Sequence, residues 1–249
     1  MLTVTQALDA IFDKVEALPH EVAALSNAQG LYLGDDVLAD VDSPPFDKAL
    51  MDGYAVLASD ITNPPIELKV IEEVTAGRVP QQTVSSGEAT RIMTGAPIPG
   101  GADCVIKVEE TETLDNAARV RILADSAVAE QNLIRQATSM KSGDVVLPGG
   151  RLLRAQELAA LAEMGTHRVV AHRQPSVAVL ATGDELVAVD QIPGPGQIRN
   201  SNETMLAAQI QRAGAISNCL GVAKDEREHL RARISEGLKH DVLLLSGGV

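Results

Sequence analysis

The chain has 249 residues and a formal net charge of −13, and 45% of its residues are hydrophobic while only 2% are aromatic. This length and this hydrophobic share suffice for one to three packed domains whose cores are built from aliphatic side chains. The acidic balance argues against non-specific binding to nucleic acid, and no apolar run is long enough to cross a bilayer.

The other exclusions concern location, thiols and metals. The N-terminus has no basic flank followed by an apolar core, so we expect no signal peptide and a cytoplasmic protein. Cys104 and Cys219 lie far apart in the sequence, and we expect two buried thiols rather than a disulfide. The five histidines are scattered without metal-ligand spacing, so each is interpreted as a surface or packing residue. The common phosphate-binding and hydrolase motifs are absent.

The N-terminal part of the chain is predicted to be helical. Residues 4–18 carry apolar side chains at helical spacing, and Pro19 closes the pattern. A second helix is expected over residues 21–28, with Gly30 as its stop.

Between residues 41 and 139 the sequence pattern changes to short β-like segments. The segments "IELKVIEEV", "ADCVIKVEETE" and "ARVRIL" alternate apolar and polar residues to different degrees, and Gly, Pro and Asn separate them. This pattern predicts an all-β insertion. After it, "AQELAALAEMG" predicts a helix that ends at Gly165, and "HRVVAH" predicts a short strand.

The last part of the chain, from residue 174 on, has the pattern of a parallel sheet. The run "SVAVLA" indicates a strand buried on both faces, and "AISNCLGV" and "DVLLLS" are interpreted as a second strand and a third buried strand. Between them, residues 202–213 are predicted to form one helix. Asp225 is predicted to cap another, with Leu230, Ile234 and Leu238 as its apolar stripe. The order β-α-β-α-β predicts parallel strands with right-handed crossovers.

Polar loops follow the predicted parallel strands, and ligands bind beyond the carboxyl ends of strands in such sheets. "TGDEL" and "AKDE" bring the carboxylates of Asp184, Glu185 and Asp225, while "SGGV" exposes backbone N–H groups suited to an oxyanion. The loop "IPGPGQIRNSN" leads into a helix start capped by Ser201 or Asn202. Together these loops favour a phosphorylated ligand with a divalent cation.

The stretch "FDKALMDGYAV" concentrates aromatic residues in a chain that has few of them. We expect Gly53 to permit a tight turn. Phe46, Met51 and Tyr54 are expected to anchor the loop on a hydrophobic base, so that Asp52 projects from it.

Several segments together resemble one known family. "MDGYAV", "RIMTGAPIPGGAD", "VAVLATGDEL", "GQIRNSN" and "SGGV" stand in the order found in molybdopterin molybdotransferases, whose relatives include the E domain of gephyrin. The resemblance implies that adenylylated molybdopterin and molybdate are converted, with Mg²⁺, to molybdenum cofactor and AMP. It also implies a homodimer, with a cleft between the β-rich region of one subunit and the α/β domain of the other, and leaves room for other cofactor-biosynthesis proteins as partners.

The fold that the resemblance implies is multidomain, α+β and α/β. Residues 12–40 and 140–173 are expected to form a discontinuous small α/β linker domain, and residues 41–139 a β-rich inserted domain. Residues 174–249, with residues 1–11 as a candidate addition, are expected to form an incomplete molybdopterin-binding α/β domain with a parallel sheet.

The resemblance also implies roles for individual residues. Asp52, Thr94, Glu185 and Asp225 are the expected catalytic residues, and Asp52 and Glu185 the expected Mg²⁺ ligands. The expected molybdopterin-binding residues are Thr182, Gly183, Asp184, Asn200, Ser201, Asn202, Ser246, Gly247 and Gly248. The four catalytic candidates and residues 200–202 also have a structural alternative, because turn residues, solvated loop acids and helix caps use the same side chains.

The sequence departs from the family pattern in two places. Ser139 stands where a site carboxylate is expected, Arg135 alone remains of an arginine-rich run, and Asp144 could substitute only after remodelling of the loop. The chain also ends at "SGGV" where the family continues, so we expect a fragment. Three hypotheses remain: an enzyme that inserts molybdate, a degenerate homologue that binds molybdopterin or its adenylate without turnover, and a protein-interaction scaffold.

Overall fold

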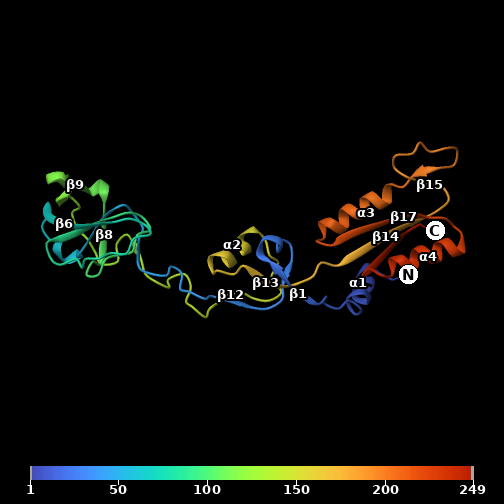
Figure 1. The fold of residues 1–249 in the computed structure, drawn as a ribbon, viewed down its shortest axis with the longest axis horizontal. Coiled ribbons are helices and arrows are strands. Elements are labelled where there is room, and N and C mark those ends of the chain that lie inside the picture. The colour runs from blue at the N-terminus through green and yellow to red at the C-terminus, as the bar shows by residue number, and fades with distance from the viewer. Residues whose placement is uncertain (1, 248–249) are drawn as a thin grey trace. The chain divides into compact units, whose positions relative to one another are not determined.

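A computed structural model of the chain describes residues 2–247 and divides into two compact units (Figure 1). Unit 1 comprises Met1–Val37 and Leu147–Val249, and unit 2 comprises Leu38–Val146. The short strands β3 (Val37–Leu38) and β12 (Val145–Leu147) mark the two places where the chain passes from one unit to the other. The finer division into three domains stays a prediction.

Unit 2 is built around a six-stranded sheet in the order β8-β5-β7-β6-β10-β9. Only the pair β6–β7 is parallel; the other pairs are antiparallel. Its strands are β5 (Gly53–Val56), β6 (Ile66–Val74), β7 (Glu88–Ile92), β8 (Cys104–Lys107), β9 (Thr111–Leu114) and β10 (Arg119–Ile122). A separate two-stranded pair joins β4 (Lys48–Ala49) and β11 (Leu133–Ile134). Single 3₁₀ turns occupy η2 (Ala58–Asp60), η3 (Val108–Glu110) and η4 (Asp115–Ala117).

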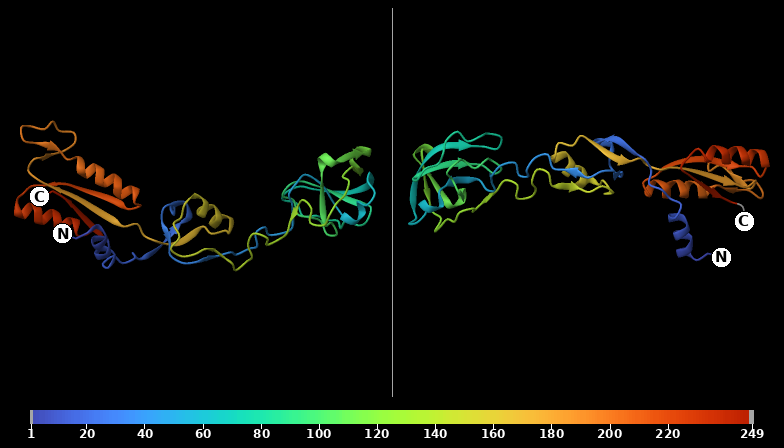
Figure 2. Two further views of the ribbon diagram at one scale, coloured as in Figure 1. Left: turned by 180° about the vertical axis from the view of Figure 1, so that it is seen from behind. Right: turned by 90° about the horizontal axis from the view of Figure 1, so that it is seen from below.

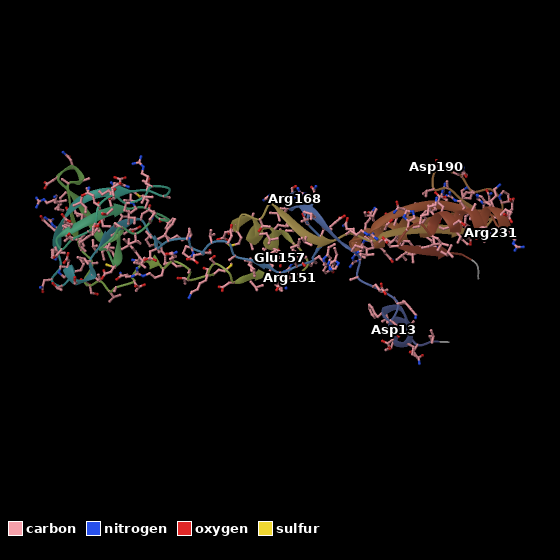
Figure 3. The ribbon with its side chains drawn as sticks, turned by 60° about the horizontal axis from the view of Figure 1, so that its bottom comes forward. Asp13, Arg151, Glu157, Arg168, Asp190 and Arg231 are labelled. Carbon is pink, nitrogen blue, oxygen red and sulfur yellow. The ribbon has the colours of Figure 1, made fainter. Side chains whose placement is uncertain are left out.

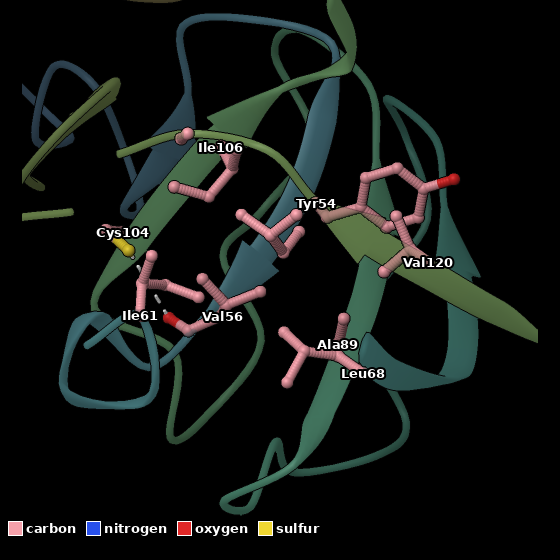
Figure 4. Packing of buried hydrophobic residues seen from close by; sticks show 10 residues of the cluster. Tyr54, Val56, Ile61, Leu68, Ala89, Cys104, Ile106 and Val120 are labelled. Carbon is pink, nitrogen blue, oxygen red and sulfur yellow. Dashed lines mark hydrogen bonds between the residues drawn. The ribbon is translucent and has the colours of Figure 1, made fainter. Parts of the chain in front are cut away.

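Strand β5 is buried along its whole length because both faces of the sheet are covered. Alternate side chains of a strand point to opposite faces. Tyr54 and Val56 therefore enter one core, which contains Leu68, Ile106 and Val120 (Figure 4). Ala55 enters a second core on the other face. The all-β character expected for this region is confirmed.

The segment "FDKALMDGYAV" differs from the expectation in the exposure of two side chains and in the role of its glycine. Tyr54 is 1% exposed and anchors the segment, but Phe46 and Met51 are 40% and 42% exposed and contribute little to a hydrophobic base. Gly53 lies inside β5 rather than in a turn, and a Cβ there would stand 1.9 Å from the carbonyl oxygen of Ile106. Glycine is therefore required by the close approach of β5 and β8, not by backbone freedom.

The N-terminal part of unit 1 differs from the predicted pair of helices. Helix α1 (Val4–Phe12) is shorter than the predicted span of residues 4–18, and none of its residues is buried, so tertiary packing does not extend it. The second predicted helix, over residues 21–28, is wrong. That segment forms β1 (His20–Ala24) and the 3₁₀ turn η1 (Leu25–Asn27), because pairing with β13 (Arg168–His172) overrides a weak helical preference.

A small antiparallel sheet in the order β1-β13-β2 forms the rest of this part, with β2 at Tyr32–Leu33. Helix α2 (Ala155–Glu163) packs its Leu161 against Leu33 and Val169 of the sheet, and the positive φ of Gly165 ends the segment as predicted. Glu157 of α2 is 4% exposed and lies beside Arg151 and Arg154 (Figure 3). The hydrogen bond from Arg154 is the main reason that the pKa of Glu157 falls to about 2.

The C-terminal part of unit 1 is a three-stranded parallel sheet in the order β17-β14-β18. Its elements are β14 (Ser176–Thr182), α3 (Ser201–Arg212), β17 (Ile216–Ala223), α4 (Arg227–Gly237) and β18 (Val242–Ser246), with a short parallel pair of β15 (Leu186–Val187) and β16 (Ile198–Arg199). The predicted β-α-β-α-β order is confirmed. Helix α3 packs on one face of the sheet and α4 on the other (Figures 1 and 2).

Three details of this sheet differ from expectation. Strand β18 is not buried, since Val242 and Leu245 are 44% and 56% exposed on a strand that pairs only with β14. Glu226, not Asp225, precedes α4, and no side chain caps that helix. Leu238 lies beyond the end of α4 and is 69% exposed, so it does not belong to the apolar stripe.

The two cysteines are free, as expected. Cys104 is buried in unit 2, and burial raises the pKa of its thiol to about 12. Cys219 is exposed, contrary to expectation, because it lies on β17 at the edge of the parallel sheet.

Candidate functional site

The predicted site residues fall into two groups, one in each unit. Asp52 and Thr94 belong to unit 2, whereas the residues expected to bind molybdopterin belong to unit 1 together with Glu185 and Asp225. Gly248 lies outside the described residues.

Asp52 and Thr94 are brought together by neighbouring strands. Asp52 directly precedes β5 and Thr94 follows β7 by two positions, and Gly53 pairs with Ile92 in the sheet. Oδ1 of Asp52 accepts two hydrogen bonds from Thr94, one from its backbone N–H at 2.7 Å and one from its hydroxyl at 2.6 Å. The pair is exposed to solvent.

The turn that carries Thr94 explains its orientation. The N–H of Ala96 donates to the carbonyl oxygen of Met93 at 3.0 Å, and Gly95 between them has a φ of 82°. This turn directs both donors of Thr94 at one carboxylate oxygen. The bonds from Thr94, first the hydroxyl and then the backbone, lower the pKa of Asp52, so its carboxylate remains ionised at neutral pH.

Ser139 and its neighbours supply no substitute carboxylate in the described geometry. Ser139 is exposed, and its backbone N–H donates to the carbonyl oxygen of Ser43 at 2.9 Å. Asp144 accepts from the N–H of Lys141 at 2.9 Å and so closes a local turn. Arg135 pairs with Asp47 and Glu130, which raise the pKa of its guanidinium further.

The second group surrounds a cavity of about 190 Å³ beyond the carboxyl ends of β14 and β18. This is the place that the rule for parallel sheets predicts. Of the residues expected to bind a ligand, those that line the cavity are Thr182, Glu185, Asn200, Ser201, Asn202, Ser246 and Gly247. Gly183, Asp184 and Asp225 do not line it.

Two glycines allow the loops around this cavity to approach closely. Gly183 has a φ of 143°, and a Cβ there would lie 2.4 Å from Oε2 of Glu185, whose side chain therefore lies over the glycine. Gly247 has a φ of 134°, and a Cβ there would lie 2.4 Å from the carbonyl oxygen of Thr182. A side chain at Gly247 would displace the backbone of β14 at Thr182, whereas one at Gly183 would displace the Glu185 side chain and strain the backbone.

The start of α3 is held by a different residue than predicted. Asn200, which is 3% exposed, is the N-cap, and its Oδ1 accepts from the N–H of Glu203 at 3.3 Å. Ser201 and Asn202 are the first helical residues, not caps. Asn202 is then available to donate from Nδ2 to the hydroxyl of Ser246 at 3.0 Å, which ties α3 to the end of β18.

Sequence reasoning missed three residues that line the cavity: Leu186, Ile198 and Arg199. Arg199 brings a positive charge to it, with its Nε donating to the carbonyl oxygen of Gln191 at 2.9 Å. Its position in "GQIRNSN", directly before the helix start, is the sequence feature that could have identified Arg199 as a site residue. Asp184 and Asp225 contact one another instead, since the N–H of Asp225 donates to Oδ1 of Asp184 at 3.3 Å.

The arrangement in unit 1 combines the cation of Arg199, the carboxylate of Glu185, three hydroxyls, two amides and the first turn of a twelve-residue helix. Such a set suits a phosphate or a similarly polar anionic group. Among the described residues, no three His, Cys, Asp or Glu side chains form a cluster that could hold a metal alone. No helix in the described part of the chain has the length and apolarity that a membrane crossing requires.

Comparison with known proteins gives a consistent result. Residues 2–165 match the family described as MoeA N-terminal region (domain I and II), and residues 178–249 match the family described as probable molybdopterin binding domain. A protein of Staphylococcus aureus strain Mu50 named molybdopterin molybdenumtransferase is 35% identical over all of this chain. One of the same name from Nostoc sp. strain PCC 7120 is 37% identical.

The chain spans 60% of the Staphylococcus aureus protein and 58% of the Nostoc protein. Among solved structures, the molybdopterin biosynthesis MoeA protein from Pyrococcus horikoshii OT3 superposes with a TM-score of 0.90 at 31% identity, over all of this chain and 67% of that one.

Proposed function

The chain belongs to the MoeA family, and from that premise we propose that it acts in molybdenum cofactor biosynthesis as a molybdopterin molybdenumtransferase. The reaction is the insertion of molybdate into adenylylated molybdopterin with release of AMP. The cavity at the ends of β14 and β18 is the observation that supports it most, because polar and aliphatic side chains line it together, it carries Arg199 and it is bounded by the first turn of α3. These are features that bind a phosphorylated ligand.

Within this proposal, the cavity binds the pterin phosphate. Arg199 neutralises its charge, and the N–H groups at the start of α3 donate to its oxygens. The hydroxyls of Thr182 and Ser246 add donors whose direction can adjust. The bond from Asn202 holds Ser246 in place.

Mg²⁺ fits the proposal as an ion held mainly by the substrate. Mg²⁺ prefers carboxylate, phosphate and water oxygens and usually takes one or two protein carboxylates. Asp52 and Glu185 are exposed carboxylates that could each serve, and no denser cluster exists among the described side chains. When bound, the ion would neutralise phosphate charge.

Asp52 has the properties of an acceptor rather than an acid. Its lowered pKa keeps it ionised, and Thr94 fixes one of its oxygens. A fixed, ionised carboxylate positions a cation or a water molecule through its charge and its hydrogen bonds. Glu185 and Asp225 are proposed to share in these duties, and Asp184 orients Asp225 through its backbone.

Molybdate-dependent release of AMP tests the proposal, with the natural-length protein, adenylylated molybdopterin and Mg²⁺. Asp52→Asn should lower the rate by about a hundredfold or more, since an amide lacks the charge that positions a cation or a water molecule. Asp125→Asn, at an exposed position in the same unit, is the matched control and should keep the rate. An Asp52→Asn variant with the rate of the control would refute the role of Asp52.

A second candidate, a protein that binds the adenylate without turnover, is favoured by Ser139. A hydroxyl cannot supply the charge of the expected carboxylate, and Asp144 is already used in a local turn. Ser139→Asp distinguishes the two candidates. AMP release by the wild type supports the enzyme, whereas tight binding with release only in the variant supports the degenerate homologue.

We also propose a cytoplasmic homodimer. Membership of the family supports the dimer, and a measurement of the mass of the protein in solution tests this proposal. A monomer at the concentrations used for the AMP assay would contradict it.

A further inference from the structure

Two histidine side chains meet on the small sheet of unit 1. His20 of β1 and His172 of β13 stand directly opposite one another in the antiparallel register. Their Nε2 atoms are 3.2 Å apart, and their rings are nearly perpendicular, at 83°, with centroids 4.2 Å apart. Opposite residues of neighbouring strands lie on the same face of a sheet, so the register brings together two residues that are 152 positions apart.

A backbone contact fixes the tautomer of His172. Its Nδ1 lies 2.8 Å from the carbonyl oxygen of Leu18. Because a carbonyl only accepts, Nδ1 carries the proton, and Nε2 presents a lone pair toward His20. Metal-binding histidines are commonly held in this way, with the other ring N–H donated to a carbonyl.

The ring of His20 is held by packing. A Cβ on Gly34 would lie 3.1 Å from both Cγ and Nδ1 of His20, so the ring lies on the bare Cα of that glycine. Without a metal, Nε2 of His20 donates its proton to Nε2 of His172. For both Nε2 atoms to bind a cation, this proton moves to Nδ1 of His20, and the charge of the ring does not change.

We propose that His20 and His172 form a binding site for a divalent late first-row transition metal, of the class of Cu²⁺ and Zn²⁺. Metal–nitrogen bonds of about 2.0–2.1 Å at tetrahedral angles place two nitrogens about 3.3 Å apart and the two ring centroids about 5 Å apart. The nitrogens are 3.2 Å apart and the centroids 4.2 Å apart, so the two rings must turn outward to bind one ion. Imidazole is a preferred ligand of these metals. This site is independent of the proposed transferase activity.

The surroundings of the pair leave room for the remaining ligands. His172, but not His20, lines a cavity of about 270 Å³ together with Leu18, Tyr32 and Arg173. The charge of Arg173 is paired with Asp241. The described residues contain no third His, Cys, Asp or Glu within a metal-binding group, so water completes the coordination. The other three histidines are separate: His240 bonds to Ser176, His229 accepts from the N–H of Lys224, and His167 is exposed.

Calorimetric titration of the untagged full chain with Cu²⁺, and separately with Zn²⁺, tests the proposal. We expect one metal per chain and a rise in melting temperature, because a ligand that binds only the folded state stabilises it. His20→Gln and His172→Gln should each weaken binding by about tenfold or more, since each removes one of two ligands. His167→Gln is the control and should bind like the wild type.

The electron paramagnetic resonance spectrum of bound Cu²⁺ adds a direct count of ligands. Two nitrogen ligands are expected in the wild type and one in either variant. If a glutamine variant does not fold, Gly34→Ala retains both imidazoles but crowds His20, and should also weaken binding. No binding by the wild type, or unchanged affinity and nitrogen count in both folded variants, would overturn the proposal.

Discussion

The sheet of unit 2 has six strands, and the parallel sheet of unit 1 has three. In unit 2, strand β5 is buried over all four of its residues, with a core on each face. In unit 1 only the central strand β14 is buried along most of its length, while β17 and β18 remain partly exposed as edges. An apolar strand is therefore buried where it has a neighbouring strand on each side, and it stays partly exposed at the edge of a sheet.

The two regions also hold different chemistry. Of the predicted site residues, unit 2 holds Asp52 and Thr94, and two hydrogen bonds from Thr94 fix the Asp52 carboxylate beside the start of β5. Unit 1 presents a cavity built from loops that meet at two glycines, Gly183 and Gly247. We therefore expect substitutions in the core of unit 2 to act mainly through stability, those at Asp52 through the reaction rate, and those around the cavity through ligand affinity.

The largest effect is expected at Gly53. Alanine there places a Cβ 1.9 Å from the carbonyl oxygen of Ile106, so β5 and β8 must separate. We expect a loss of about 3 kcal/mol or more in the free energy of unfolding of unit 2, measured by urea denaturation. Gly100→Ala is the control, since its Cβ would come no closer than 3.4 Å to the side chain of Thr83. Equal costs for the two variants would contradict the close approach.

Substitution of one leucine in each sheet allows a direct comparison of how much burial contributes to stability in the two units. Leu68 in unit 2 is 1% exposed, and Leu245 on β18 is 56% exposed. Leu68→Ala should cost about 3 kcal/mol, and Leu245→Ala about 0.5 kcal/mol or less, each measured by denaturant unfolding. A similar cost for Leu245→Ala would mean that β18 is covered in solution.

The core of unit 2 buries a hydroxyl group that has no hydrogen-bond partner, and a substitution that removes this hydroxyl should stabilise the unit. Thr90 is fully buried, and its hydroxyl has no hydrogen-bond partner. Thr90→Val keeps the shape and removes the unpaired group, so we expect a gain of about 1 kcal/mol in the free energy of unfolding. Thr111→Val is the control, because its hydroxyl donates to the carbonyl oxygen of Val108 at 2.8 Å and its loss should destabilise. Destabilisation by Thr90→Val would show that the hydroxyl has a partner.

The smallest effect concerns the pKa of Asp52. Thr94→Val removes the hydroxyl that lowers this pKa most and leaves the backbone donor, so the pKa should rise toward its ordinary value. A depressed carboxyl pKa contributes stability above the pKa of the unfolded chain, and that contribution is lost as the pH falls through the folded pKa. The variant should therefore lose a little stability at neutral pH and less in acid.

An NMR titration of the Asp52 carboxyl measures this shift. Thr138→Val, whose hydroxyl bonds to the carbonyl oxygen of Arg135 instead, is the control. An unchanged pKa in Thr94→Val would mean that Thr94 does not hold Asp52 in solution.

The secondary structure was predictable where one local signal dominates. The run at residues 176–181 indicated β14, and the alternation at residues 66–74 indicated β6, because burial on two faces and on one face leaves different patterns. Residues 21–28 were wrongly predicted as a helix, because their strand depends on pairing with β13, which is distant in sequence. The exposure of β18 was not predictable either, since it depends on its place in the sheet.

The candidate site was predictable in part. The sheet order indicated its position, and loop composition indicated polar residues there, but the N-cap role of Asn200 and the place of Arg199 at the cavity depend on how the loop before α3 folds. The pairing of Asp52 with Thr94 depends on two neighbouring strands, and the resemblance, rather than any local pattern, drew attention to both residues. Their catalytic roles stay predictions.

The most direct test of the account is a titration of the protein with adenylylated molybdopterin. We predict that Arg199→Gln weakens binding roughly tenfold, through the loss of a charged contact, while Arg78→Gln on unit 2 binds like the wild type. Equal affinity of Arg199→Gln and wild type would contradict the assignment of ligand binding to the cavity beside β14 and β18.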